Sequence, residues 1–167
     1  MKICILGTGT MGSGIAQTFA QNGYDVIMKD ISEEMLQKGM SHINKGLDFL
    51  IKRENITESD KQQALSHIST TLTYDDIKDC DIVIEAIAEI MSLKKIVFRE
   101  LDEVCKPETI LATNSSSLSI TEIAATTKRP EKVIGMHFFN PVPAMKLVEI
   151  IKGHLTDEKV HAGVFEL

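Results

Sequence analysis

The feature that constrains this chain most is a cluster of glycines close to its start. Gly7, Gly9 and Gly12 form a Gly-x-Gly-x-x-Gly pattern between an apolar run at residues 3–6 and a segment with helical spacing at 11–21. In such a unit the first glycine permits a tight turn, the second lets a phosphate approach the backbone, and the third lets helix and strand pack closely. The free N–H groups of the helix start attract phosphates. We therefore expect a dinucleotide-binding turn; the alternative is a glycine turn that binds nothing.

A carboxylate stands where a dinucleotide-binding fold recognises a ribose. Asp30 follows a second expected strand at 25–29 and lies 18 residues after Gly12. An acidic side chain there accepts hydrogen bonds from the ribose hydroxyls and repels a 2′-phosphate, which favours NAD over NADP. Because Lys29 stands beside Asp30, NADP remains an alternative cofactor. Asp30 could alternatively be a solvated residue or part of a helix cap near Ser32.

Apolar runs and helical spacing alternate along the whole chain. We expect strands at 2–6, 25–29, 68–72, 81–85, 109–113 and 132–136, and a further strand at 145–151. Helices are expected at 11–21, 32–53, 57–67, 93–105 and 156–167, with a short one that Ser119 and Glu122 begin as a capping box. This order predicts an α/β, Rossmann-like, doubly wound and mainly parallel sheet with helices on both faces, as one domain over residues 1–167.

A histidine and a glutamate form the second candidate site. His137 stands at the end of the sixth expected strand, before the stiff segment FFNPVP, and Glu149 interrupts the apolar segment LVEII. If the chain returns antiparallel about Pro143, the two residues fall opposite each other. A histidine oriented by a carboxylate is a general base suited to neutral pH. The alternative is a hydrogen-bonded core histidine and an exposed glutamate on an edge strand.

Polar residues also follow the fourth and fifth expected strands. The segment from Asn114 to Ser119 carries hydroxyls that could hold a substrate oxygen or a cofactor amide, or simply form a polar turn before the next helix. No Gly-x-Ser-x-Gly hydrolase motif is present. Glu85 and Glu89 follow the fourth strand, near where the opposite edge of a bound dinucleotide would pass. We interpret them as ordinary loop carboxylates; the alternative is a contact with the dinucleotide.

Composition excludes several classes of function. The net charge of −6 argues against nucleic-acid and anionic-membrane partners. No apolar run approaches the ~20 residues that a membrane span needs. Cys4, Cys80 and Cys105 lack metal-ligand spacing, so we expect free thiols and no metal site. The first apolar run begins at residue 3, which leaves no room for a targeting peptide and predicts a cytoplasmic protein.

Three segments together resemble the L-3-hydroxyacyl-CoA dehydrogenase family, and within it the bacterial 3-hydroxybutyryl-CoA dehydrogenases. They are GTGTMG at 7–12, ATNSSSL at 112–118, and GMHFFNPVP at 135–143 with the following MKLVEII. The resemblance covers essentially the whole chain, and HFFNPVP is its most specific part. It implies an NAD-dependent oxidoreductase that transfers a hydride between NAD(H) and C3 of a short-chain 3-hydroxyacyl-CoA or 3-oxoacyl-CoA, such as acetoacetyl-CoA.

The resemblance also implies roles for individual residues. His137 matches the catalytic base, Glu149 its orienting partner, and Ser116 the serine that bonds the substrate's 3-oxygen near the nicotinamide. Lys52 and Arg53 match a region that contacts the CoA moiety, although they could equally be an exposed basic helix end. The positions that match cofactor contacts are Gly7, Thr8, Gly9, Thr10, Met11, Gly12, Asp30, Glu89, Lys94, Ser116 and Asn140.

Some features depart from the family pattern. Ile90 stands where the family often has asparagine, and Ser115 where it often has threonine. Family members continue into an all-helical C-terminal domain that closes the substrate cleft and forms most of a homodimer interface, whereas residues 156–167 form only the helix that would lead to it. The alternative function is therefore an NAD-binding module without independent turnover. A β-hydroxyacid dehydrogenase with a lysine base is a third interpretation, which the HFFNP segment disfavours.

Overall fold

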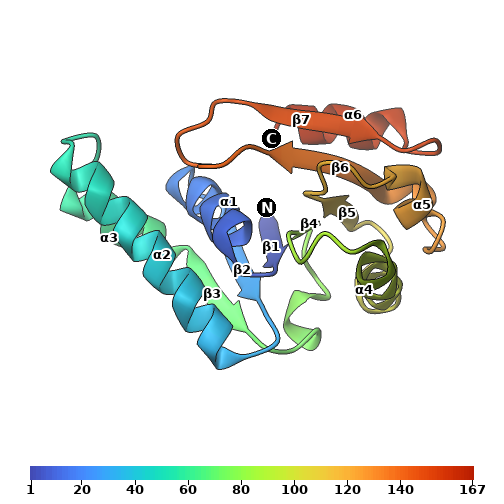
Figure 1. The fold of residues 1–167 in the computed structure, drawn as a ribbon, viewed down its shortest axis with the longest axis horizontal. Coiled ribbons are helices and arrows are strands. Elements are labelled where there is room, and N and C mark those ends of the chain that lie inside the picture. Colours follow the sequence, from blue (N-terminus) through green and yellow to red (C-terminus); the bar gives the residue numbers. More distant parts are fainter.

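A computed structural model describes residues 1–167 and shows one seven-stranded sheet (Figure 1). The strands lie in the order β3-β2-β1-β4-β5-β6-β7. β1 to β6 run parallel, and β7 pairs antiparallel with β6 at the edge. The strand bounds are Lys2–Leu6 (β1), Asp25–Lys29 (β2), Ile68–Thr71 (β3), Ile82–Glu85 (β4), Ile110–Thr113 (β5), Val133–Phe138 (β6) and Val148–Lys152 (β7). The doubly wound, mainly parallel sheet predicted from the sequence is confirmed.

Helices cover both faces of the sheet. They are Thr10–Gln21 (α1), Glu33–Lys52 (α2), Glu58–Ser66 (α3), Met91–Val104 (α4), Ile120–Ala124 (α5) and Glu158–Phe165 (α6), with short 3₁₀ turns at Asp75–Ile77 and Pro130–Lys132. Apolar residues of α1, α2, α3 and α6 pack in one core cluster, and those of α4 and α5 pack in another on the opposite face. None of the helices is long and apolar enough to cross a bilayer.

The helix starts follow the polar residues that cap them. Ser32, Thr57 and Asp157 accept hydrogen bonds from backbone N–H groups of the first turns of α2, α3 and α6. Ser119 caps α5 in the same way, but the expected capping box is incomplete, because the Glu122 side chain instead pairs with Lys95 at 2.5 Å. The start of α1 has no side-chain cap and no acidic residue, so its first N–H groups remain available.

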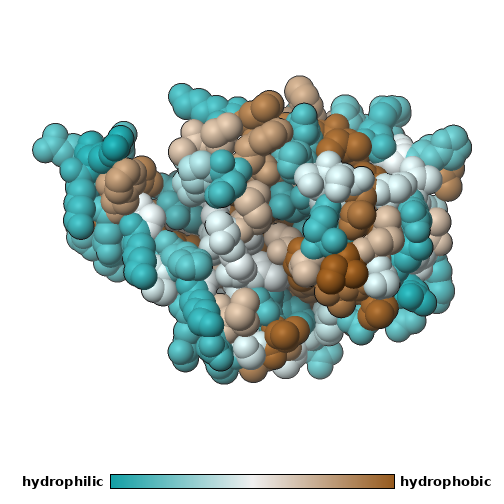
Figure 2. All heavy atoms as spheres, viewed as in Figure 1, coloured by the Kyte–Doolittle hydropathy of each residue, from teal (hydrophilic) through white to brown (hydrophobic).

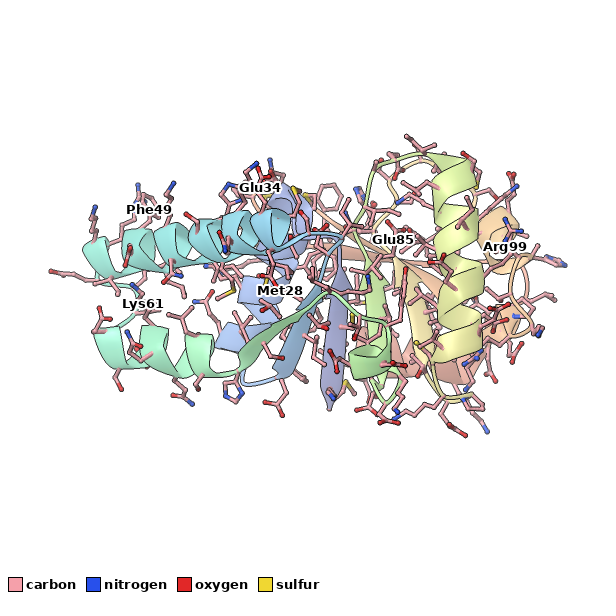
Figure 3. The ribbon with its side chains drawn as sticks, turned by 90° about the horizontal axis from the view of Figure 1, so that it is seen from below. Met28, Glu34, Phe49, Lys61, Glu85 and Arg99 are labelled. Atoms are coloured by element: carbon pink, nitrogen blue, oxygen red, sulfur yellow. The ribbon has the colours of Figure 1, made fainter.

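The α2–α3 pair extends away from the rest of the domain. Lys61 on α3 lies between the two helices and pairs with Asp48 on α2 at 2.6 Å (Figure 3). In Figure 2 this arm is mostly hydrophilic. The larger hydrophobic patches on the same face lie over the body of the domain. The opposite face of α2 contributes Leu36, Ile43 and Leu47 to the core.

Three element boundaries differ from the sequence-based expectation in ways that affect the site. α4 begins at Met91 rather than at residue 93, so the loop after β4 is shorter. β6 continues through Phe138, which places His137 within the strand instead of after it. The segment at 145–147 is not part of β7, which begins at Val148. The antiparallel pairing with β7 extends β6 to Phe138, beyond the expected end of the strand.

The glycine turn has the geometry that its sequence pattern predicts. Gly7 has φ +94°, a conformation that side chains disfavour, and its N–H donates to Lys29 O at 2.9 Å. A Cβ on Gly12 would lie 1.8 Å from Gly7 O, so this glycine lets α1 pack against the turn. A Cβ on Gly9 would meet nothing within 4 Å, which leaves open space beside the helix start.

All three cysteines are buried free thiols. Burial raises the pKa of Cys80 and of Cys105 to about 11. The thiols therefore serve as small apolar side chains, and Cys4 lies in the same core cluster as the other two.

The Gly12 contact generates a prediction about stability. Gly12→Ala should lower the free energy of unfolding in urea by about 3 kcal/mol, because the new methyl group meets backbone that cannot yield easily. Gly163→Ala is the matched control, since Gly163 lies inside α6 and its Cβ position is free. That variant should gain up to about 1 kcal/mol from helix propensity. A Gly12→Ala protein as stable as wild type would contradict the packing described.

Candidate active site

The pairing of β6 with β7 brings His137 and Glu149 together. The two residues are direct partners in the antiparallel register, and His137 Nδ1 lies 2.8 Å from Glu149 Oε2. A carboxylate only accepts hydrogen bonds, so this contact assigns a proton to Nδ1, and in the neutral ring Nε2 is the nitrogen left to accept one. The His137 side chain is 19% exposed, and its ring lies 4.5 Å from the Phe139 ring between centroids. The predicted juxtaposition is confirmed, and Glu149 is half exposed on the edge strand β7.

The loop after His137 docks on the glycine-rich helix. Val142 is buried, and a Cβ on Gly14 would lie only 3.0 Å from Val142 Cβ. The absence of a side chain at Gly14 therefore lets loop 139–147 approach α1. Because α1 begins at the glycine turn, this contact connects the histidine strand to the dinucleotide-binding end of the domain.

A cavity of about 480 Å³ lies between α1, α2 and this loop. Its lining includes Thr10 and Ser13 of α1, Phe49 of α2, Arg53 at the end of α2, and Asn140 of the loop. Arg53 stacks over the Phe49 ring at 4.7 Å. The structure thus brings Arg53 and Asn140 to one cavity, whereas Lys52, predicted with Arg53, is not among the lining residues.

The serine segment is fixed to the histidine strand by Asn114. Its Oδ1 accepts a hydrogen bond from Phe138 N at 2.9 Å, which continues the β5–β6 pairing by a side chain. Ser115 is buried, and its hydroxyl donates to Glu89. The Ser116 N–H donates to Glu89 Oε1 at 3.1 Å, and the exposed Ser116 hydroxyl bonds to no protein group. Of the serines at 115 and 116, Ser116 is therefore the one with a free hydroxyl.

A network of charges lies at the ends of β4 and β5, where Figure 3 labels Glu85. Glu85 is the last residue of β4 and not a loop carboxylate, which corrects its interpretation. Glu89 lies in the loop after β4, as interpreted, but pairs with Lys94. Glu85 is fully buried in β4 and accepts from Lys94 Nζ at 2.6 Å, Ile87 N at 2.7 Å and Thr113 Oγ1 at 2.7 Å. Lys94 is 1% exposed and also contacts Glu89 Oε2 at 3.2 Å. The lysine thus bridges the two carboxylates.

Glu89 connects this network to the serine segment. Its burial alone would raise its pKa, but the hydrogen bond from Ser115 and the charge of Lys94 outweigh burial and hold the pKa of Glu89 below its usual value. Glu89 therefore remains charged at neutral pH. The chain from Glu85 through Lys94 and Glu89 fixes the backbone at Ser116.

The cofactor end of the site lies at the point where the strand order reverses, between β1 and β4. Asp30 Oδ2 accepts from the N–H and the hydroxyl of Thr8, each at 2.7 Å, and Asp30 Oδ1 accepts from Ile31 N at 2.7 Å. Asp30 is therefore held against the glycine turn and does not cap α2, which Ser32 caps. Of the remaining motif positions, Thr10 is exposed and Met11 half-buried at the start of α1.

An adenosine-sized cavity lies beside these groups. It has a volume of about 440 Å³, and Gly7, Thr8, Gly9 and Asp30 line it together with apolar side chains such as Leu93 and Val97. The open space at Gly9, the uncapped start of α1, the carboxylate and the apolar cavity are all features that a dinucleotide requires. The residues present therefore fit such a cofactor.

Sequence reasoning missed the roles of Glu85, Thr8, Gly14 and Asn114. Two of them carried a usable signal: Gly14 is a fourth glycine beyond the three that the motif explains, and Glu85 ends the strongly apolar run DIVIE. A carboxylate at such a position needs a buried partner. The contacts of Thr8 and Asn114 join residues 22 and 24 positions apart, and no local pattern indicates them.

These features define a Rossmann-type dinucleotide-binding domain. The sheet is mainly parallel, a glycine turn lies where the strand order reverses, and charged groups lie at the carboxyl ends of the strands. Residues 2–167 match the family model described as 3-hydroxyacyl-CoA dehydrogenase, NAD binding domain. The chain belongs to this family.

The chain is similar to several known proteins over almost its whole length. It is 54% identical over 167 residues to 3-hydroxybutyryl-CoA dehydrogenase of Clostridioides difficile, and 41% identical over 165 residues to 3-hydroxyadipyl-CoA dehydrogenase of Escherichia coli. The crystal structure of (S)-3-hydroxybutyryl-CoA dehydrogenase from Ralstonia eutropha matches 99% of this chain with a TM-score of 0.97 and 48% identity. The chain spans 59%, 35% and 58% of these three proteins, respectively.

The buried network generates a second prediction. Lys94→Met should lower the free energy of unfolding by about 3–5 kcal/mol, because it leaves the buried Glu85 carboxylate without its cation. Glu85→Gln combined with Lys94→Met should cost less than the two single losses added together. The adjacent Lys95 is the control, since its pair with Glu122 is partly exposed and Lys95→Met should cost less than about 1 kcal/mol. Additive losses in the double variant would show that the two side chains do not interact as described.

Proposed function

We propose that this chain binds NAD(H) and supplies the general base of a 3-hydroxyacyl-CoA dehydrogenase that acts on short-chain substrates such as acetoacetyl-CoA. The observation that carries the proposal is the 2.8 Å contact between His137 Nδ1 and Glu149 Oε2 on the same domain as the glycine turn. The family match supports NAD as the cofactor. The names of the relatives from Clostridioides difficile and Ralstonia eutropha support a short acyl chain.

The residues around the glycine turn would hold the cofactor. The N–H groups at the start of α1 would bind the pyrophosphate, and Asp30 would accept from the adenosine ribose while its charge repels a 2′-phosphate. Glu89, Lys94, Ser116 and Asn140 would lie toward the nicotinamide half. NAD, when bound, supplies the hydride acceptor, and NADH the donor.

His137 would move the proton that accompanies the hydride. In the oxidative direction its Nε2 takes the proton of the substrate's 3-hydroxyl, and in the reductive direction the imidazolium returns it. Glu149 holds the ring in the correct tautomer and stabilises the imidazolium charge. The free hydroxyl of Ser116 would bond the substrate's 3-oxygen and so orient it.

The cavity between α1, α2 and loop 139–147 is the proposed site for the acyl-CoA. Arg53 at its rim would attract the CoA phosphates. Lys52 neighbours Arg53 but lies outside the lining, so we expect it to add only long-range attraction.

Replacing the proposed base tests this assignment. His137→Gln should lower kcat for acetoacetyl-CoA reduction by about 10²–10⁴-fold, the usual contribution of a general acid or base, and leave the Kd for NADH unchanged. Loss of NADH absorbance measures turnover, and fluorescence titration measures binding. His154→Gln is the control, because His154 is exposed on the loop between β7 and α6. Unchanged turnover in His137→Gln would refute the assignment.

The same assay separates an enzyme from a binding module. Turnover by this chain that depends on His137 supports the catalytic proposal. NADH binding without turnover of acetoacetyl-CoA would instead support the alternative, an NAD-binding module without independent activity.

A further inference from the structure

Lys29 carries an ammonium group without a protein partner beside the glycine turn. It is the last residue of β2 and is 5% exposed, yet its ammonium forms no ion pair or hydrogen bond with any protein group. Its Nζ lies 4.0 Å from the centroid of the Tyr74 ring. Buried lysines are normally paired, and a ring face replaces only part of the lost hydration. The ammonium therefore retains unused donors.

The surroundings of Lys29 place these donors in the adenosine-sized cavity. Lys29, Asp30 and Tyr74 line that cavity of about 440 Å³ together with the glycine turn. The backbone of Lys29 is fixed to the turn, because its carbonyl accepts from Gly7 N at 2.9 Å. The Tyr74 hydroxyl donates to Glu100 at 2.8 Å, which fixes the ring beside the ammonium. Burial, and then this hydrogen bond, raise the pKa of Tyr74, so its ring stays neutral.

The shape and polarity of the cavity decide which ligand group the ammonium would meet. Most of the lining is apolar, and Ile31 and Leu93 expose their side chains there. A flat heterocycle with nitrogen acceptors on its edge suits an apolar cavity that one cationic donor lines. A 2′-phosphate does not, because it would carry about two negative charges into apolar surroundings beside the Asp30 carboxylate.

We propose that Lys29 recognises the adenine base of the dinucleotide by donating a hydrogen bond from its ammonium to a ring nitrogen. The proposal rests on the proposed function, because it takes NAD(H) as the ligand of this cavity. It assigns to Lys29 a role in selecting the base, whereas Asp30 selects the unphosphorylated ribose.

Binding titrations with whole and partial cofactors test the proposal. Lys29→Met keeps the length and apolar stem of the side chain and removes the donors. It should lower the affinities for NADH and for 5′-AMP by a similar factor of about tenfold. This is the order of loss expected when one hydrogen bond to a charged donor is removed. Reduced nicotinamide mononucleotide, which lacks adenosine, should bind both proteins equally. Lys159→Met, on the exposed face of α6, controls for the change in net charge and should alter none of the three affinities.

Three results would overturn the proposal. The first is unchanged affinity for NADH and 5′-AMP in Lys29→Met. The second is an equal loss of affinity for the mononucleotide, which would indicate general damage to the site. The third is a loss of affinity for NADPH much larger than for NADH, which would assign Lys29 to the 2′-phosphate. A thermal unfolding midpoint close to that of wild type verifies that the variant is folded. A wild-type chain that binds no NADH would refute the proposed function itself, and this inference with it.

Discussion

The antiparallel register between β6 and β7 is the constraint on which the rest of the site depends. Side chains alternate between the two faces of a sheet, so a slip of one residue would move Glu149 to the face opposite His137. The register is defined on one side by the end of β6, where Asn114 binds the Phe138 backbone, and on the other by loop 139–147, which Val142 anchors against Gly14. Both anchors belong to elements that also position the cofactor end, so the proposed base and the glycine turn are held in one rigid arrangement.

A second layer of support lies beneath the carboxyl ends of β4 and β5. Lys94 bridges Glu85 and Glu89, and Glu89 in turn accepts from Ser115 and from the Ser116 backbone. Burying such charges costs free energy unless each one is paired, and every buried side-chain polar atom here has a partner. The network fixes the position of Ser116 while leaving its hydroxyl free, which is the condition that a substrate-orienting serine requires.

Much of this arrangement follows from local patterns in the sequence. The strand and helix alternation, the glycine turn, the caps at Ser32 and Thr57 and the pairing of His137 with Glu149 were all predicted, because each depends on spacing along the chain. Contacts that depend on the order of the strands in the sheet were not predicted. The burial of Glu85 arises because β4 lies between β1 and β5, and the separation of Lys52 from the cavity lined by Arg53 depends on the rotation of one helix. Local periodicity contains neither kind of information.

The most direct test of this account is the protonation state of His137, measured by ¹H–¹⁵N NMR of the imidazole in the folded chain at a pH where the ring is neutral. We predict the tautomer with the proton on Nδ1, hydrogen-bonded to Glu149, with Nε2 unprotonated and its nitrogen shift displaced by an acyl-CoA ligand. Glu149→Ala, which removes the side-chain acceptor of Nδ1, should remove the hydrogen-bonded Nδ1 proton signal. A neutral ring with its proton on Nε2 in the wild-type chain, or an Nδ1 signal that Glu149→Ala leaves unchanged, would contradict the assignment of His137 and Glu149 as an oriented general base.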